Sequence, residues 1–305
     1  MDQEQDLSKL RDLTTEQTNP ASTDLDTKSA LEIAEIINGQ DATVAGAVKR
    51  VLPQIATAIE AVTSAIREGG RLIYVGAGSS GRIAALDASE CPPTFNIDPT
   101  SVQFVIAGGS KALGASAEFN EDSTEQGERD IAKKRPTRKD VICGIAASGR
   151  TPYTVAAVDY AKRRGAITVA VTCNRDSPLG KVADIEIAVE VGPEVLSGST
   201  RMKAGTAQKM VLNMITTGAM ARLGYVYDNL MVNVHLNNEK LVERGIEILC
   251  KASNVDRGKA EEALKLSGRS VPIALVMLKA QVDRNEAHKR LHAVGGNVRR
   301  AIENG

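Results

Sequence analysis

The chain has 305 residues, 38 basic and 38 acidic side chains and a hydrophobic fraction of 42%. This length allows one main domain plus a smaller one, and the balanced charge excludes a general attraction to nucleic acid or membrane surfaces. The sequence has no apolar leader and no run of about 18 apolar residues, so we expect a cytoplasmic protein. Because the four cysteines are scattered and the three histidines are far from the glycine-rich loops, we expect free buried thiols and no metal site.

In chain order, residues 1–50 are polar apart from an amphipathic segment at 29–37 and predict a helical arm. Helical and strand patterns then alternate. The predicted strands are residues 72–75, 102–107, 141–146, 167–172 and 184–191. The predicted helices are residues 55–66, 80 to about 90 (stopped by Pro92-Pro93), about 121–134, 152–164 and 203–223. Apolar strands separated by helices indicate an α/β fold, a five-stranded parallel sheet with helices on both faces.

The chain changes character after Asn237, where strand patterns end. Five short helical patterns follow, at residues 240–250, 257–265, 271–279, 284–292 and 298–303. We therefore expect three parts: an N-terminal helical arm at 1–50, a ligand-binding α/β domain at 51–232 and a small C-terminal helical module at 233–305. The module is expected to serve packing or dimerisation.

The most informative segment follows the first predicted strand and reads Gly76-Ala77-Gly78-Ser79-Ser80-Gly81. Bare amides at the start of a helix, with two hydroxyls beside them, favour a phosphate-like anion. The glycines also match the G-x-G-x-x-G spacing of dinucleotide sites, but no acidic residue ends a clean second strand about 20 residues later. We therefore rank a sugar phosphate above NAD, with Gly78, Ser79 and Ser80 as binding residues.

Two further segments bring hydroxyls and cations to strand ends. The turn Ser148-Gly149-Arg150-Thr151 follows the third predicted strand, and a second such turn at the same sheet edge strengthens the case for a phosphate. Residues 192–209 lead from the fifth strand into the long helix and place there Ser197, Ser199, Thr200, Arg201 and Lys203. Cations at a helix start oppose its dipole, which makes sense if an anion binds between them. The alternatives are helix-capping serines and a solvated basic loop.

These motifs resemble known proteins. The first two turns resemble the sugar isomerase (SIS) domain, which implies a flavodoxin-like strand order. Residues 86–95 (with Glu90), the second turn, residues 192–209 and Asn229-Leu230-Met231-Val232 resemble the N-acetylmuramic acid 6-phosphate etherases, and the resemblance runs from about Thr15 into the C-terminal part. The segment 192–209 is also similar to the glucokinase regulatory protein, so it does not separate an enzyme from a regulator. The stretch around Glu90 favours the enzyme.

The resemblance implies a lyase of amino-sugar recycling. It would cleave the D-lactyl ether of N-acetylmuramic acid 6-phosphate to N-acetylglucosamine 6-phosphate and D-lactate, with Glu90 and Glu121 as the catalytic pair. A C1 aldehyde acidifies the C2 proton, a base removes it, an acid protonates the departing lactate, and water adds to the alkene; no metal or redox cofactor is needed. We expect Glu121, near a helix N-terminus, to be the base and Glu90, at a helix end, to be the acid.

The sequence departs from the family pattern at one residue. Phe119 stands where the family usually has a small residue, two positions before the second glutamate. Because Glu90 is expected at the far end of its helix, we expect a homodimer whose partner completes the site.

The main alternative is a non-catalytic sugar-phosphate-sensing regulator, which needs the binding turns but not the acid–base pair. An aldose–ketose isomerase would need a base after the long helix that we cannot identify, and a neutral chain without a basic helix-turn-helix disfavours a transcription regulator.

Overall fold

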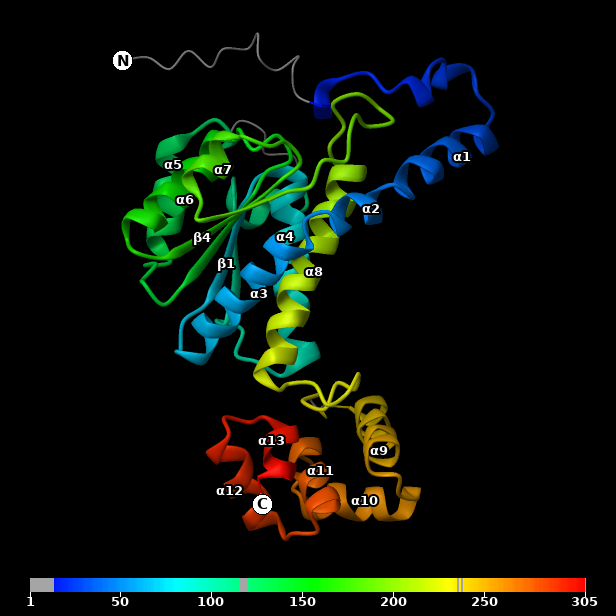
Figure 1. Cartoon of the computed structure of the whole chain (residues 1–305), viewed down its shortest axis with the longest axis vertical. Coiled ribbons are helices and arrows are strands. Elements are labelled where there is room, and N and C mark those ends of the chain that lie inside the picture. Colours follow the sequence, from blue (N-terminus) through cyan, green and yellow to red (C-terminus); the bar gives the residue numbers. More distant parts are fainter. Residues whose placement is uncertain (1–13, 116–119, 235, 237, 305) are drawn as a thin grey trace. The chain divides into compact units, whose positions relative to one another are not determined.

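The computed structural model describes residues 14–115, 120–234, 236 and 238–304. Phe119, the departure from the family pattern, therefore lies outside the described residues. The chain forms two compact units (Figure 1). The first comprises the chain up to Ala88 together with Thr100–Ile215, and the second comprises Ser89–Pro99 and the chain from Thr216 onward.

A parallel five-stranded sheet forms the centre of the first unit. Its strands are β1 (Leu72–Gly76), β2 (Val102–Ile106), β3 (Val141–Ile145), β4 (Ile167–Thr172) and β5 (Ile185–Ala188). The order β2-β1-β3-β4-β5 confirms the predicted fold class and the flavodoxin-like arrangement. Every residue of β1 and β3 is buried, as expected for strands covered on both faces.

Helices cover the two faces of this sheet. The helices of the first unit are α1 (Ala30–Asp41), α2 (Val44–Lys49), α3 (Leu52–Arg67), the first part of α4 (Gly78–Phe95), α5 (Thr124–Lys133), α6 (Pro152–Arg163), α7 (Pro178–Val182) and the first part of α8 (Lys203–Leu223). Alternate side chains of a strand face opposite sides, so Ile73 and Val75 pack with α5, α6 and α7. Tyr74 faces the other side, where its hydroxyl donates a 2.8 Å hydrogen bond to Asp87 on α4.

The carboxyl ends of β1 and β3 lie side by side, because Gly76 is in register with Ile145. The chain leaves β1 toward β2 on one side, while β3 lies on the other side. Such a switch in strand order opens a crevice beyond the strand ends, where ligands of open α/β sheets bind. This edge therefore receives both predicted phosphate turns.

Several predicted helix boundaries are wrong, two of them for a clear physical reason. Pro92 and Pro93 do not stop α4, which continues to Phe95. Prolines remove their own amide donors, but the following amides remain, and that of Asn96 donates to the Pro92 carbonyl at 2.8 Å. The helix α5 begins at Thr124 rather than near Glu121, because the Ser123 side chain accepts the Gln126 amide and caps the helix there.

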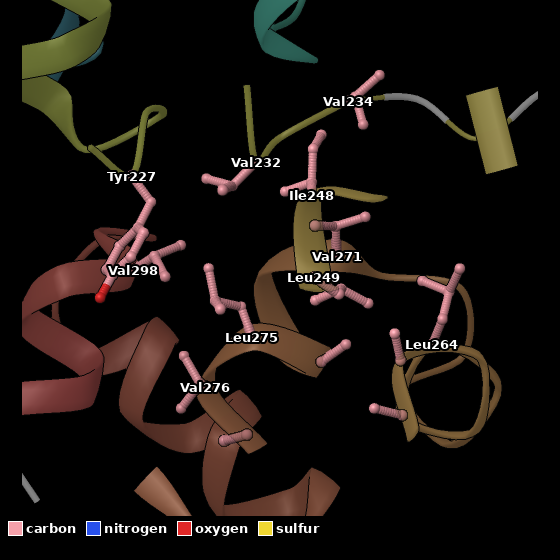
Figure 2. Close-up of a cluster of buried hydrophobic side chains, with 14 of the residues drawn as sticks. Tyr227, Val232, Val234, Ile248, Leu249, Leu264, Val271, Leu275, Val276 and Val298 are labelled. Atoms are coloured by element: carbon pink, nitrogen blue, oxygen red, sulfur yellow. The ribbon is translucent and has the colours of Figure 1, made fainter. Parts of the chain in front are cut away.

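The second unit has a helical core of its own. Its C-terminal helices are α9 (Glu239–Ser253), α10 (Arg257–Leu266), α11 (Val271–Ala280), α12 (Arg284–Ala293) and α13 (Val298–Glu303), so all five predicted helices are present. An Asn, Asp or Ser side chain caps the start of each one. Figure 2 shows the apolar side chains that gather between them, among them Val232, Leu249, Leu275 and Val298.

Candidate functional site

A cavity of about 390 Å³ lies at the carboxyl ends of β1 and β3. The turn after β1, the turn after β3 and the segment before α5 all contribute to its walls. The lining residues are Glu16, Ala77, Gly78, Ser79, Ser80, Arg82, Glu121, Ala146, Ala147, Ser148, Thr151 and Thr200. The two turns predicted to bind a phosphate therefore meet in one place.

The first turn enters α4 directly. Gly78 has φ of +50°, a conformation that a side chain disfavours, and it is the first residue of the helix. Ser79 and Ser80 follow in the first helical turn, where amides have no partner within the helix. Amides and two hydroxyls therefore border the cavity together, an arrangement suited to a phosphate.

The second turn enters α6 with its hydroxyls on the cavity. Ser148 accepts the Arg150 amide at 3.2 Å, and Thr151 precedes α6 without a capping hydrogen bond from its side chain. Capping therefore does not account for the hydroxyl of Thr151. Gly149 does not line the cavity; it has φ of +67°, and a Cβ there would lie 2.4 Å from the Ser177 side chain.

Glu121 lies beside the first turn. Its carbonyl accepts the Tyr153 amide at 3.0 Å, which fastens the segment before α5 to the start of α6. Its carboxylate reaches the first turn, since a Cβ added at Gly78 would lie 2.9 Å from Oε1. Glu121 thus lines the cavity ahead of α5, close to the position expected from the sequence.

Two further charged residues of the cavity escaped the sequence analysis. Arg82 lies one turn into α4, and its guanidinium donates to the carbonyls of Ala112 and Ala115 at 2.9 and 2.8 Å. Glu16 comes from the 3-10 turn Thr14–Glu16, more than a hundred residues before Glu121. Arg82 directly follows the first glycine-rich turn, of which only the amides and hydroxyls were singled out, and no local pattern marks Glu16.

The start of α8 differs from the expectation. The buried carboxylate of Glu194 accepts the amides of Lys203 and Ala204, each at 2.9 Å, so the protein's own anion occupies this helix start. The buried ammonium of Lys203 donates to Gln40 at 2.9 Å. Burial lowers the pKa of Lys203, while the nearby carboxylates of Glu194 and Asp41 act in the opposite direction. Lys203 thus holds α1 rather than lining the cavity.

The remaining predicted binding residues lie elsewhere. Among the residues that the structure describes in segment 192–209, Thr200 is the one that lines this cavity. Ser197 lines a second cavity of about 690 Å³ with Leu25, Leu196 and others. The other predicted residues outside the lining are Arg150, Ser199 and Arg201.

Glu90 is exposed on α4, twelve residues after Gly78, and belongs to the second unit. Among the described residues, no group of three or more His, Cys, Asp or Glu side chains could hold a metal ion. Within the same residues, no helix is long and apolar enough to cross a membrane.

Known proteins match both the fold and the sequence. Residues 54–162 match the glucokinase regulatory protein N-terminal SIS domain, and residues 122–218 match the SIS domain. A phosphoheptose isomerase from Francisella tularensis has the same fold, with a TM-score of 0.50 and 18% identity, covering 64% of this chain and all of its own. The N-acetylmuramic acid 6-phosphate etherase of Glaesserella parasuis is 49% identical and covers 97% of this chain and 98% of its own.

The chain belongs to the N-acetylmuramic acid 6-phosphate etherase family. The relative from Clostridium beijerinckii, with the same family name, is 48% identical and covers 96% of this chain and 97% of its own. This confirms the resemblance given by the motifs. The etherase relatives cover the chain beyond both SIS matches, through the C-terminal helices. The family membership therefore favours the enzyme over the regulator.

Proposed function

We propose that this chain is a carbon–oxygen lyase that releases D-lactate from N-acetylmuramic acid 6-phosphate and leaves N-acetylglucosamine 6-phosphate. The observation that carries the proposal is the meeting of both hydroxyl-rich turns and Glu121 in one cavity. The family membership supports the choice of substrate.

The phosphate is proposed to bind between the two turns. The amides at the start of α4 and the hydroxyls of Ser79, Ser80, Ser148 and Thr151 supply donors on several sides. The charged lining residues are two carboxylates and one arginine. Amides and hydroxyls, rather than a cluster of cations, therefore provide most of the phosphate site.

Glu121 is proposed as the general base. Ring opening exposes an aldehyde at C1, which acidifies the C2 proton. Glu121 removes this proton, the electron pair forms the C2–C3 double bond, and the C3–O bond to lactate breaks as lactate takes up a proton. Water then adds its oxygen at C3, and a proton returns to C2. A positioned acid or base contributes about 10²–10⁴-fold to such steps.

Glu90 is proposed as the acid for the departing lactate, acting in the cavity of a second copy of the chain. An α-helix rises about 1.5 Å per residue, so the twelve residues from Gly78 to Glu90 span roughly 18 Å along α4. A carboxyl group at that distance along the helix does not reach the turn that begins it. A homodimer would supply Glu90 from the partner chain.

The direct test is release of lactate from N-acetylmuramic acid 6-phosphate by the purified chain. Release with the phosphorylated sugar and none with N-acetylmuramic acid is the expected result, while binding of the sugar phosphate without lactate release would support the sensing regulator instead.

A mixing experiment tests the shared site. Glu90→Gln and Glu121→Gln chains, each inactive alone, should recover about a quarter of the wild-type activity when mixed and allowed to exchange partners, since half of the sites in half of the dimers are intact. If Glu90 acted within its own chain, mixing would recover nothing.

A further inference from the structure

We infer that Glu16, on the N-terminal segment Thr14–Glu16, is a specificity-determining residue that accepts a hydrogen bond from a hydroxyl or the acetamido N–H of the sugar in the cavity. The inference rests on the proposed function, because it assigns a role inside the same sugar-phosphate site. The inference is based on hydrogen bonds that hold this segment beside the turn after β3, which is the second turn proposed to bind the phosphate.

Asn174, just after β4, fastens the segment to the site. Its Oδ1 accepts the amide and the hydroxyl of Thr14, at 3.2 and 3.0 Å. Its Nδ2 donates to the hydroxyl of Thr15 at 3.3 Å and to the carbonyl of Ala147 at 3.1 Å. Asn174 is 6% exposed and Thr15 is fully buried. Because Ala147 belongs to the second turn, one buried side chain joins Glu16's segment to the phosphate site.

The segment after β5 holds Glu16 from another side. The hydroxyl of Ser197 donates to the carbonyl of Glu16 at 3.2 Å. A Cβ added at Gly198 would lie 3.2 Å from Oε2 of Glu16, so this segment runs close beside the carboxylate. These contacts leave the carboxylate of Glu16 on the wall of the cavity.

A second fastening lies three residues farther along the chain. The amide of the Asn19 side chain donates to Gln40 at 2.8 Å and to the carbonyl of Pro193 at 3.0 Å. The same oxygen of Gln40 accepts the buried Lys203 ammonium. The N-terminal segment is thus tied down on both sides of Glu16, by Asn174 before it and by Asn19 after it.

Electrostatics decides which part of the substrate Glu16 can bind. A carboxylate accepts hydrogen bonds and repels a phosphate, so Glu16 does not serve the phosphate end of the cavity. The lactyl group also carries a carboxylate, which Glu16 repels as well. The hydroxyls and the acetamido N–H of the sugar remain as donors, and a hydrogen bond from such a donor to a charged acceptor is worth about ten- to a hundredfold in affinity.

The test compares two ligands by calorimetry, N-acetylglucosamine 6-phosphate and inorganic phosphate. Glu16→Ala should weaken binding of the sugar phosphate about ten- to a hundredfold and leave inorganic phosphate unchanged or bound more tightly, because a repelling charge is gone. Ser197→Ala, which removes the hydrogen bond to the Glu16 carbonyl without touching the second turn, should show the same selective loss to a smaller degree. Glu35→Gln, an exposed carboxylate on α1 outside the cavity lining, is the matched control and should bind both ligands as the wild type does.

Equal loss of both ligands in Glu16→Ala, or no loss of the sugar phosphate, would overturn the inference. Thermal unfolding of each variant shows whether an equal loss comes from the fold. A wild-type chain that binds N-acetylglucosamine 6-phosphate no better than N-acetylglucosamine would instead count against the proposed function, so the two failures are distinguishable.

Discussion

Replacement of Gly78 by alanine should separate catalysis from stability. The positive φ of Gly78 makes a side chain there cost about 1–2 kcal/mol. The new Cβ would lie 2.9 Å from Oε1 of Glu121, which is too close, so the carboxylate must move. A carboxylate is the flexible end of its side chain and can move at little cost to the fold. A displacement of about 1 Å in a catalytic group can lower the rate about 10²-fold.

Gly127→Ala provides the contrast. A Cβ at Gly127 would lie 2.2 Å from the carbonyl oxygen of Tyr153, where the backbones of α5 and α6 meet and cannot give way cheaply. We therefore expect Gly127→Ala to lose stability in urea unfolding. Gly78→Ala should unfold within about 1–2 kcal/mol of the wild type and release lactate about a hundredfold more slowly.

A double variant shows whether the effect passes through Glu121. In Gly78→Ala/Glu121→Gln the displaced base is already gone, so the second substitution should add little to the loss of lactate release. Fully additive losses would refute the reasoning, because they would place the effect of Gly78 outside its contact with Glu121.

Three further predictions concern binding, acid stability and thiol reactivity. Ser148→Ala should weaken the binding of N-acetylglucosamine 6-phosphate by about 1–3 kcal/mol, measured by calorimetry. Unchanged affinity would show that Ser148 does not bind the ligand. Burial raises the pKa of Asp140, but hydrogen bonds from Arg71 and from the amide and hydroxyl of Thr137 outweigh burial and lower this pKa. The stabilisation that ionised Asp140 provides is therefore present above about pH 4 and lost as the pH falls further. In Asp140→Asn, the free energy of unfolding in urea should therefore depend less on pH between about pH 5 and pH 3 than in the wild type. Burial raises the pKa of Cys173 to about 12, so a thiol reagent at pH 8 should label Cys250 in the folded chain and Cys173 only after unfolding.

The central sheet could be predicted because its signals are local. The apolar runs of β1, β3 and β4 match largely buried strands, and the turns after β1 and β3 carry glycine and serine signatures. The C-terminal helices of the second unit could be predicted equally well, since each begins at a capping side chain. The two turns predicted to bind a phosphate were identified by the same local reasoning, and they line one cavity.

The features of the site that the sequence did not predict depend on contacts between residues far apart in the chain. The cations at the start of α8 suggested an anion from outside, whereas Glu194, nine residues before Lys203, supplies the carboxylate itself. Glu16 reaches the cavity through Asn174, 160 residues after Thr14, and no pattern around Glu16 indicates that neighbour. The end of α4 was misjudged because proline marks a weakened helix rather than a certain boundary.

Exchange of the C2 proton of N-acetylglucosamine 6-phosphate in heavy water tests the central claim, that Glu121 is the base in this cavity. The wild-type chain should exchange this proton, Glu121→Gln should lose the exchange by about 10²–10⁴-fold, and the neighbouring exposed carboxylate variant Asp122→Asn should keep it. Glu90→Gln should retain exchange while losing lactate release. Exchange at the wild-type rate in Glu121→Gln would contradict the account.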